Sequence, residues 1–375
     1  MLARYWDKLD SLIEPERVLV IYGPRRVGKT TLIKNFLANT HLKYRFDSGD
    51  DLGVQEILCS ESVEKIRRFA ENYQLIVIDE AQKISKIGTG LKILVDHVPG
   101  IKVVATGSSS FDLSNKIGEP LTGRKRTIAL YPLAQIELKL NFNSYDLSQR
   151  LEEFLVYGSY PEILQTQTLA GKRDKLNELV NSYLFRDVLE MERLKGAKVL
   201  LDLLRLLAFQ VGSEVSLREL GQKLELDAKT VARYLDLLEK SFVVINLRGL
   251  SRNLRTEVTR TSKYFFYDNG IRNALISNFN ELSKRNDIGA LWENFLFSER
   301  LKYQSIKPLW ANNYFWRTWS QKEIDFVEER EGKYFAYEFK YKPDRRIKLP
   351  HEFIQAYPGT EFRIVDATNY LEFLV

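Results

Sequence analysis

Short apolar runs alternate with helical patterns over roughly the first 135 residues of this 375-residue chain. The clearest runs are at residues 18–22, 75–78 and 102–107. Such runs are typical of strands buried on both faces, and their alternation with helices is typical of a parallel sheet covered by helices. The pattern therefore predicts an α/β domain over residues 1–135. Further elements expected in it are strands at 44–47 and 126–130 and a helix at 63–73.

The hydrophobic pattern changes twice after this domain. Residues 136–195 show helical spacing without strands, which predicts a small helical lid or linker with a long helix at 175–194. Residues 196–263 predict a helix, a helix–turn–helix pair and a hairpin, which is the order of a winged helix. Residues 264–375 predict a second α/β domain. Its expected elements are a helix at 289–296 and strands at 323–327 and 334–340.

Two local signals support the helices of residues 196–263. Ser216 and Glu219 form a capping box, and Asp227 is in position to cap the helix that starts near residue 229. The second helix of such a pair can enter a DNA major groove, and basic side chains beside it can contact phosphates. A winged helix used only for packing or protein contacts is the alternative. The candidate DNA contacts are Lys229, Thr230, Arg233, Arg248, Arg252 and Arg255.

A glycine-rich segment follows the first apolar run and precedes a helical pattern. It has the sequence G-x-x-x-x-G-K-T of a loop that wraps nucleotide phosphates, in the strand–loop–helix context that this motif needs. Its backbone N–H groups are expected to point at the phosphates, with Lys29 on the β and γ oxygens and Thr30 on Mg²⁺. The segment predicts a nucleoside triphosphate site, with ATP as the default. Its residues are Gly23, Pro24, Arg25, Arg26, Val27, Gly28, Lys29, Thr30 and Thr31.

Two acids, Asp79 and Glu80, end the second buried run. Because open α/β sheets bind ligands at the carboxyl ends of their strands, both are expected beside the phosphate loop. Asp79 is expected to hold the Mg²⁺ shell, and Glu80 to polarise the attacking water. Hydroxyls after the third run, on Thr106, Ser108 and Ser109, are candidates for sensing the γ-phosphate. A serine-rich helix cap is the alternative.

Composition narrows the class of protein without deciding its partner. Apolar residues make up 44% of the chain, which suits several folded cores. A single cysteine and three scattered histidines exclude a disulfide framework and a cysteine or histidine metal cluster. No secretory signal or membrane-spanning apolar run is evident, so a cytoplasmic location is expected. The net charge of +6 and a pI near 9.0 permit a polyanionic partner without demanding one.

A second set of candidate catalytic residues lies in the last domain. Asp325 is on a predicted strand, and Glu338 and Lys340 lie two residues apart on the next, so these two share a sheet face. The two acids are suited to a divalent ion, and Lys340 to a water or to charge on phosphorus. Glu293, near the start of a helix, completes the set. A nuclease-type site with Mg²⁺ or Mn²⁺ is one interpretation; coincidental surface acids or a decayed site are the other.

Taken together, these motifs resemble prokaryotic AAA-type ATPases that carry a winged helix and a restriction-endonuclease-like C-terminal domain, a largely uncharacterised family. The resemblance spans essentially the whole chain and includes residues 23–30, 78–82, 106–109 and 121–124 besides the C-terminal acids. It implies an ATPase core and a PD-(D/E)xK nuclease-like core. It also implies Arg124 as an arginine finger acting in trans, which needs a homo-oligomer; a structural arginine is the alternative.

Three functions follow from these expectations. The first is an ATP-dependent DNA-processing enzyme that cuts DNA with Mg²⁺ or Mn²⁺, and branched or otherwise structured DNA is its expected substrate because no base-reading motif is evident. The second is a nucleotide-controlled switch whose C-terminal domain binds DNA or a protein and never cuts. The third is a chaperone-like ATPase that remodels proteins and lacks the salt-sensitive DNA affinity of phosphate contacts.

Overall fold

The computed structural model describes residues 2–108, 120–184, 197–251, 262–307, 309–344 and 346–375. The chain divides into two compact units. The N-terminal unit consists mainly of Ala3–Tyr131, and the C-terminal unit mainly of Pro132–Glu239 and Val243–Val375. Each unit has its own β-sheet.

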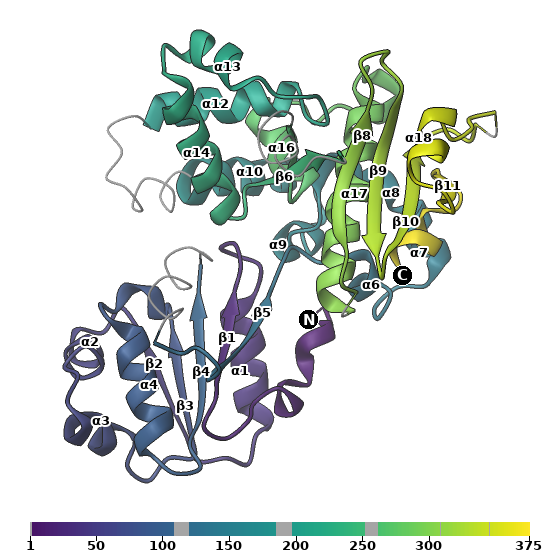
Figure 1. The fold of residues 1–375 in the computed structure, drawn as a ribbon. Coiled ribbons are helices and arrows are strands. Elements are labelled where there is room, and N and C mark those ends of the chain that lie inside the picture. Colours follow the sequence, from purple (N-terminus) through teal and green to yellow (C-terminus); the bar gives the residue numbers. More distant parts are fainter. Residues whose placement is uncertain (1, 109–119, 185–196, 252–261, 308, 345) are drawn as a thin grey trace. The chain divides into compact units, whose positions relative to one another are not determined.

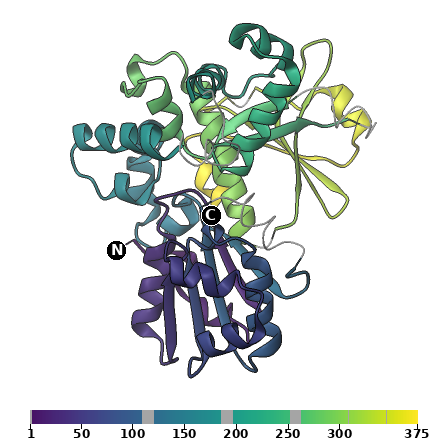
Figure 2. The same cartoon turned by 90° about the vertical axis from the view of Figure 1, so that its left-hand side faces the viewer.

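A five-stranded parallel sheet forms the centre of the N-terminal unit, in the order β2-β3-β4-β1-β5. Figures 1 and 2 show helices on both faces of this sheet, with α1 on one side and α4 on the other. The parallel α/β fold expected for this part of the chain is confirmed. The strands are β1 (Val18–Tyr22), β2 (Tyr44–Ser48), β3 (Leu75–Asp79), β4 (Lys102–Gly107) and β5 (Lys125–Ala129). The helices are α1 (Lys29–Asn39), α2 (Leu52–Leu58), α3 (Val63–Ala70) and α4 (Ile87–His97), with 3₁₀ turns at Tyr5–Asp7, Leu9–Ser11 and Ala81–Lys83.

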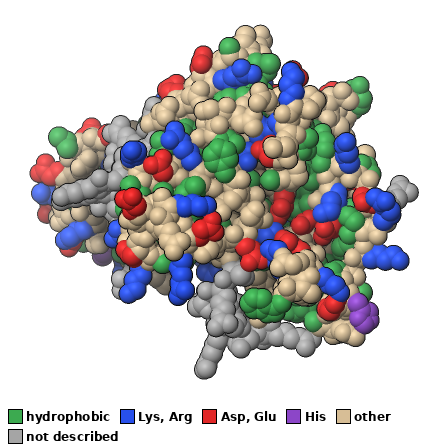
Figure 3. Space-filling view, turned by 90° about the horizontal axis from the view of Figure 1, so that it is seen from above, with side chains coloured by type: hydrophobic (Ala, Val, Ile, Leu, Met, Phe, Trp, Pro, Cys, Tyr) green, Lys and Arg blue, Asp and Glu red, His purple; other side chains and the backbone are tan. Residues whose placement is uncertain are grey.

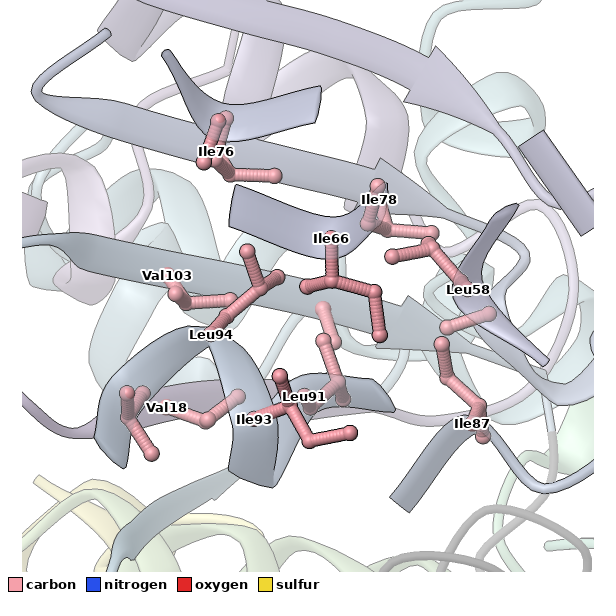
Figure 4. Packing of buried hydrophobic residues seen from close by; sticks show 14 of the residues in the cluster. Val18, Leu58, Ile66, Ile76, Ile78, Ile87, Leu91, Ile93, Leu94 and Val103 are labelled. Carbon is pink, nitrogen blue, oxygen red and sulfur yellow. The ribbon is translucent and has the colours of Figure 1, made fainter. Parts of the chain in front are cut away.

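Buried aliphatic side chains hold α3 and α4 against one face of the sheet (Figure 4). Ile76, Ile78 and Val103 project from the central strands into the same cluster as Ile66 of α3 and Leu94 of α4. All five side chains are fully buried, and burying one of this kind contributes about 1.5–3 kcal/mol. Because β3, β4 and β1 are parallel neighbours, their carboxyl ends lie together at one edge of a well-packed sheet.

The C-terminal unit begins with short helices. They are α6 (Gln135–Leu138), α7 (Ser144–Gln149), α8 (Leu151–Tyr157), α9 (Pro161–Leu164) and α10 (Leu169–Glu178), followed by a π-type segment at Leu179–Leu184. The long helix expected at 175–194 changes its hydrogen-bonding type at Leu179, and its part from residue 185 lies outside the described residues. The next helices, α12 (Ala197–Phe209), α13 (Leu217–Leu224) and α14 (Ala228–Lys240), occur in the order expected for a helix and a helix–turn–helix pair.

A six-stranded mixed sheet lies in the C-terminal unit, in the order β11-β10-β9-β8-β6-β7. The hairpin β6–β7 is continuous with the later strands, because Arg248 and Gly249 of β6 pair with Tyr314 and Phe315 of β8. The strands are β6 (Val244–Gly249), β7 (Ser262–Phe266), β8 (Asn312–Arg317), β9 (Glu323–Arg330), β10 (Lys333–Phe339) and β11 (Glu361–Val365). The other helices are α16 (Asn269–Leu275), α17 (Ile288–Ile306), α18 (His351–Ala356) and α19 (Tyr370–Leu374), with a 3₁₀ turn at Leu282–Lys284.

This continuous sheet bears on the expected division of the chain. The boundary expected between residues 263 and 264 falls inside β7, whose pairing with β6 extends across it. The four-domain division, at 1–135, 136–195, 196–263 and 264–375, stays a prediction. Within the described ranges, no helix combines the length and the apolar character needed to cross a bilayer.

Candidate functional site

The phosphate-loop segment connects β1 to α1 through two glycines in unusual backbone conformations. Gly28 caps α1 with φ 98° and ψ 23°, in the left-handed region that glycine adopts at little cost. Gly23 has φ 150°, and a Cβ at this position would lie 2.0 Å from the carbonyl oxygen of Leu130. Both positions therefore require glycine. Gly28 is needed for its left-handed backbone, and Gly23 is needed also because a Cβ there has no room.

The loop is braced by one lysine and one arginine. Lys29 is 6% exposed, and its Nζ donates hydrogen bonds of 2.8 Å to the carbonyl oxygens of both Gly23 and Pro24. Arg4 donates to the carbonyl oxygens of Val27 and Tyr131, so it ties the loop to the end of β5. Sequence reasoning missed Arg4, because nothing in the motif points to a residue so far upstream.

Asp79 meets two threonine hydroxyls at the carboxyl end of β3. The hydroxyl of Thr30 donates to Oδ2 of Asp79 at 2.8 Å, and the hydroxyl of Thr106 donates to Oδ1. The backbone N–H of Glu80 also donates to Oδ1, at 3.2 Å. These donors are all neutral, so none of them is a counter-charge for the carboxylate. Carboxylate and hydroxyl oxygens are the ligands that Mg²⁺ prefers, so this pair fits the expected ion.

Glu80 is held by a glutamine. It has a left-handed backbone with φ 52°, and Nε2 of Gln82 donates to its Oε2 at 2.6 Å. The same Nε2 donates to the hydroxyl of Ser108 at 3.1 Å, which joins the ends of β3 and β4. Sequence reasoning quoted Gln82 within the motif but gave it no role. The side chain of Thr31 is exposed, and Ser109 lies outside the described residues.

Arg124 lies at the other end of the sheet from the phosphate loop. Its carbonyl accepts the N–H of Val18 at the start of β1, whereas the loop follows the end of that strand. A strand of this length puts the two positions about 16 Å apart. The Arg124 side chain pairs with Asp96 of α4 at 3.3 Å. Within one chain the structure does not bring Arg124 to the site.

The C-terminal acids and Lys340 are brought together from three elements. Tyr337 pairs with Phe326 in the antiparallel ladder, which places Glu338 of β10 next to Asp325 of β9. Nζ of Lys340 lies 2.7 Å from Oε1 of Glu338 and 3.7 Å from Oδ2 of Asp325. That Asp325 oxygen also accepts the backbone N–H of residue 339 at 2.8 Å.

A second lysine, which sequence reasoning missed, links Glu293 of α17 to this group. Lys263 of β7 has a side chain only 3% exposed, and its Nζ lies 3.1 Å from Oε1 of Glu293 and 2.5 Å from Oε1 of Glu323. The same Nζ is 5.1 Å from the ring centre of Phe315, over its face. We call Glu293, Glu323, Asp325 and Glu338, with Lys263 and Lys340, the carboxylate–lysine cluster. The available sequence signal was a lone lysine directly before three aromatic residues in one strand.

Burial and mutual repulsion shape the charges of this cluster. Burial raises the pKa of Glu293 to about 8; Lys263 opposes the rise, and Asp325 adds to it. Burial and the neighbouring Asp325 also raise the pKa of Glu338. For Lys263 and Lys340, burial favours the neutral amine, but the surrounding carboxylates outweigh it and raise both pKa values. Both lysines are therefore ammonium ions at neutral pH.

The cluster has the oxygen donors of a Mg²⁺ or Mn²⁺ site but not its arrangement. Within the described part of the chain, no three or more Asp, Glu, His or Cys side chains are grouped so that they can hold a metal ion. Ammonium groups stand among the carboxylates instead. As arranged, these residues do not fit a divalent ion.

The candidate DNA contacts lie in two places. Lys229 and Arg233 are exposed one turn apart on α14, whereas Thr230 donates its hydroxyl to the capping Asp227. Arg248 is exposed on β6, and residues 252 and 255 lie outside the described ranges. On the face that Figure 3 shows, Lys and Arg side chains are interspersed with Asp and Glu rather than gathered into one basic stripe.

Three family models match consecutive parts of the chain. Residues 15–139 match an AAA domain, 148–282 a domain of unknown function (DUF8612), and 288–372 another domain of unknown function (DUF4143). The AAA match, the parallel sheet and the loop geometry identify the N-terminal unit as a P-loop ATPase domain of the AAA type.

Two relatives that match most of the chain are each named as an uncharacterized protein. An uncharacterized protein of Mycobacterium tuberculosis is 26% identical over 86% of this chain and 70% of its own length. One of Methanocaldococcus jannaschii is 26% identical over 85% of this chain and 74% of its own length. Among solved structures, a Walker-type ATPase of Pyrococcus abyssi has a TM-score of 0.47 at 16% identity, covering 72% of this chain and 94% of its own.

Proposed function

We propose that the N-terminal unit binds and hydrolyses ATP with Mg²⁺, and that the chain uses this hydrolysis to process DNA. The observation that carries the ATPase half is the meeting of Thr30 and Thr106 on the two oxygens of Asp79 at the carboxyl end of β3. A carboxylate with neutral donors beside a phosphate loop is suited to a magnesium–nucleotide complex.

Each residue of this site has a task that its contacts support. Thr30 and Asp79 would hold Mg²⁺, which neutralises charge on the transferring phosphoryl group. The N–H groups of the loop, fixed by Gly23 and Gly28, orient the phosphates, and Lys29 exchanges its carbonyl partners for phosphate oxygens. Glu80 polarises the attacking water when its carboxylate is released from Gln82.

The DNA-processing half draws on the C-terminal unit. The exposed pair on α14 suits phosphate contacts, and the four residues of the expected nuclease-type set, Glu293, Asp325, Glu338 and Lys340, stand in one cluster. Cleavage would require a divalent ion on these acids in place of the Lys263 ammonium. Branched or otherwise structured DNA is the proposed substrate class, and the proposed winged helix is the module that engages it.

A second candidate is an ATP-controlled switch whose C-terminal unit binds DNA or a protein without cutting. The contacts of Lys263 favour it, because a buried ammonium already offsets the charge of the acids. The two candidates share the ATPase and differ only in whether DNA is cut.

Self-assembly is a further part of the proposal. Arg124 lies about 16 Å from the phosphate loop of its own chain, measured along the strand. If it acts as an arginine finger, it would therefore do so in the site of a neighbouring copy. Its pairing with Asp96 supports the structural alternative equally well.

One pair of assays tests the function. ATP turnover is measured for the wild type, Glu80→Gln and the exposed-acid control Glu71→Gln, with and without linear and branched DNA. A cleavage gel in Mg²⁺ and in Mn²⁺ runs beside it, with Asp325→Ala, Glu338→Ala and the control Glu361→Ala. We expect Glu80→Gln alone to abolish turnover; unchanged turnover in Glu80→Gln refutes the ATPase assignment. Cutting that survives both cluster variants refutes the nuclease, and no cutting under either metal supports the switch.

A further inference from the structure

Lys263 is the most enclosed cation of the carboxylate–lysine cluster. Its side chain is 3% exposed, compared with 39% for Lys340, and it contacts Glu293 and Glu323 while lying over the ring of Phe315. Glu293 comes from α17 and Glu323 from the start of β9. One ammonium group thus joins the helix and the strand that supply the acids.

The backbone around Lys263 is held on both sides. Leu247 of β6 pairs with it on one side, and Glu214 forms a bridge to it on the other. The N–H of Val215 donates to the carbonyl oxygen of Ser262 at 2.9 Å. Lys263 can therefore leave the acids only by a change of side-chain rotamer or by movement of the whole β7 edge.

The segment that holds β7 belongs to the turn between α12 and α13. Gly212 in this turn has φ 76°, and a Cβ there would lie 2.8 Å from Oε2 of Glu293. Glu214 receives the Arg317 guanidinium at 3.1 Å, and the same arginine lies 3.8 Å from Glu323. The turn between α12 and α13 is thus in direct contact with the cluster.

Electrostatics makes the ammonium and a divalent ion alternatives. A divalent ion on the oxygens of Glu293 and Glu323 would lie within a few Å of the Lys263 ammonium, and like charges repel strongly at such a distance in a partly buried site. A buried ammonium removed from its partners leaves those acids uncompensated, so something must replace it.

We propose that the ammonium group of Lys263 is the resident cation of the cluster and stands in the place of a divalent ion, so that the acids do not form a metal site while Lys263 is present. The inference concerns the same acids as the proposed nuclease-type site, but it does not require that site to cut DNA.

Mn²⁺ binding to the full-length chain tests this directly, by electron paramagnetic resonance without nucleotide. All proteins carry Asp79→Asn, so that the phosphate-loop site does not contribute. The variants are Lys263→Met, which removes the ammonium from a side chain of similar length, Lys263→Arg, which keeps the charge, and the exposed control Lys333→Met. We expect Lys263→Met to gain a site at least about tenfold tighter than the parent, a factor equivalent to 1.4 kcal/mol. Lys263→Arg and Lys333→Met should bind like the parent.

Two further measurements keep the result decisive. Adding Glu293→Gln or Asp325→Asn to Lys263→Met should abolish the gained site, and retention in both would place that site elsewhere and overturn the proposal. If Lys263→Met is poorly folded, Mn²⁺ should raise its unfolding temperature while leaving that of Lys263→Arg unchanged; no such rise overturns the proposal. Equal Mn²⁺ affinity in Lys263→Met and its parent overturns it as well. A chain that gains Mn²⁺ but never cuts DNA refutes only the nuclease.

Discussion

Two groups of carboxylates in this chain have opposite surroundings. In the N-terminal unit, Asp79 accepts hydrogen bonds from two threonine hydroxyls and a backbone N–H. In the C-terminal unit, Glu293 and Glu323 are paired with the buried Lys263, and Asp325 and Glu338 with Lys340. The difference lies in the donors, which are neutral in one unit and cationic in the other.

The comparison teaches that acids at strand ends do not by themselves make a metal site. A carboxylate held by neutral donors is oriented but keeps its full charge for an incoming ion. A carboxylate paired with ammonium has already had its charge offset, so a metal must also supply the free energy of breaking that pair. The acid of the phosphate-loop site is therefore not offset by a cation, whereas the acids of the carboxylate–lysine cluster are already paired with ammonium groups.

The largest expected effect concerns the phosphate-loop site. Asp79→Asn removes the one charge that Thr30 and Thr106 hold in place, so ATP turnover should fall by about 10²–10³-fold. Steady-state turnover beside the control Glu71→Gln measures this. Turnover within a factor of about three of wild type, well short of the tenfold that 1.4 kcal/mol represents, would mean that Asp79 does not serve the reaction.

The next effect concerns the carboxylate–lysine cluster. Lys263→Met leaves Glu293 and Glu323 without their shared cation, so the free energy of unfolding should fall by about 3–5 kcal/mol in EDTA. The exposed Lys333→Met should change it by less than about 0.5 kcal/mol. Denaturant titration gives both values. Equal effects of the two substitutions would show that Lys263 is not the counter-charge of the acids.

Gly212 offers a smaller and more specific disturbance. A Cβ there would press on Oε2 of Glu293, whereas Gly332, with nearly the same φ of 75°, has nothing within 4 Å. Gly212→Ala should therefore cost about 1 kcal/mol more than Gly332→Ala, because it must also shift a carboxylate that holds a hydrogen bond. Urea unfolding of the two variants measures the difference. A difference of zero would mean that the turn does not constrain Glu293.

The last effect is a dependence on pH. Since burial raises the pKa of Glu293 from its ordinary 4.5 to about 8 in the folded chain, the folded state binds this proton more tightly than the unfolded state. The stabilisation from this group is complete below pH 4.5 and is lost as the pH rises through 8. Thermal unfolding at pH 5 and pH 8 should therefore show a larger loss for the wild type than for Glu293→Gln. Parallel losses would contradict the raised pKa of Glu293.

The features that the sequence predicted well depend on neighbours in the chain. Lys29 and Thr30 follow a glycine pair in a motif whose geometry is local, and Asp79 ends a strand whose direction decides where its carboxylate lies. The same argument from strand direction applies to Arg124. Its place just before β5, a parallel neighbour of β1, puts it at the far edge of the sheet.

The features that sequence reasoning missed depend on pairing between distant segments. Lys263 reaches Glu293 and Glu323 because β6 pairs with β8, which lies more than sixty residues further along the chain. The hydrophobic pattern of the sequence does not show which distant strands pair. Gln82 is close in sequence to Glu80, but its contact with Ser108 depends on the pairing of β3 with β4. Charges inside a site are set by such contacts, which is why the acids were found and their counter-charge was not.

Counting Mn²⁺ ions on the wild-type chain tests the contrast between the two groups of acids most directly. With a non-hydrolysable ATP analogue and no DNA, titration followed by electron paramagnetic resonance should find one tightly bound ion per chain. Asp79→Asn should remove it and Asp325→Asn should leave it unchanged. A second tightly bound ion that disappears in Asp325→Asn would contradict the account, because it would show that the carboxylate–lysine cluster accepts a metal while Lys263 is in place.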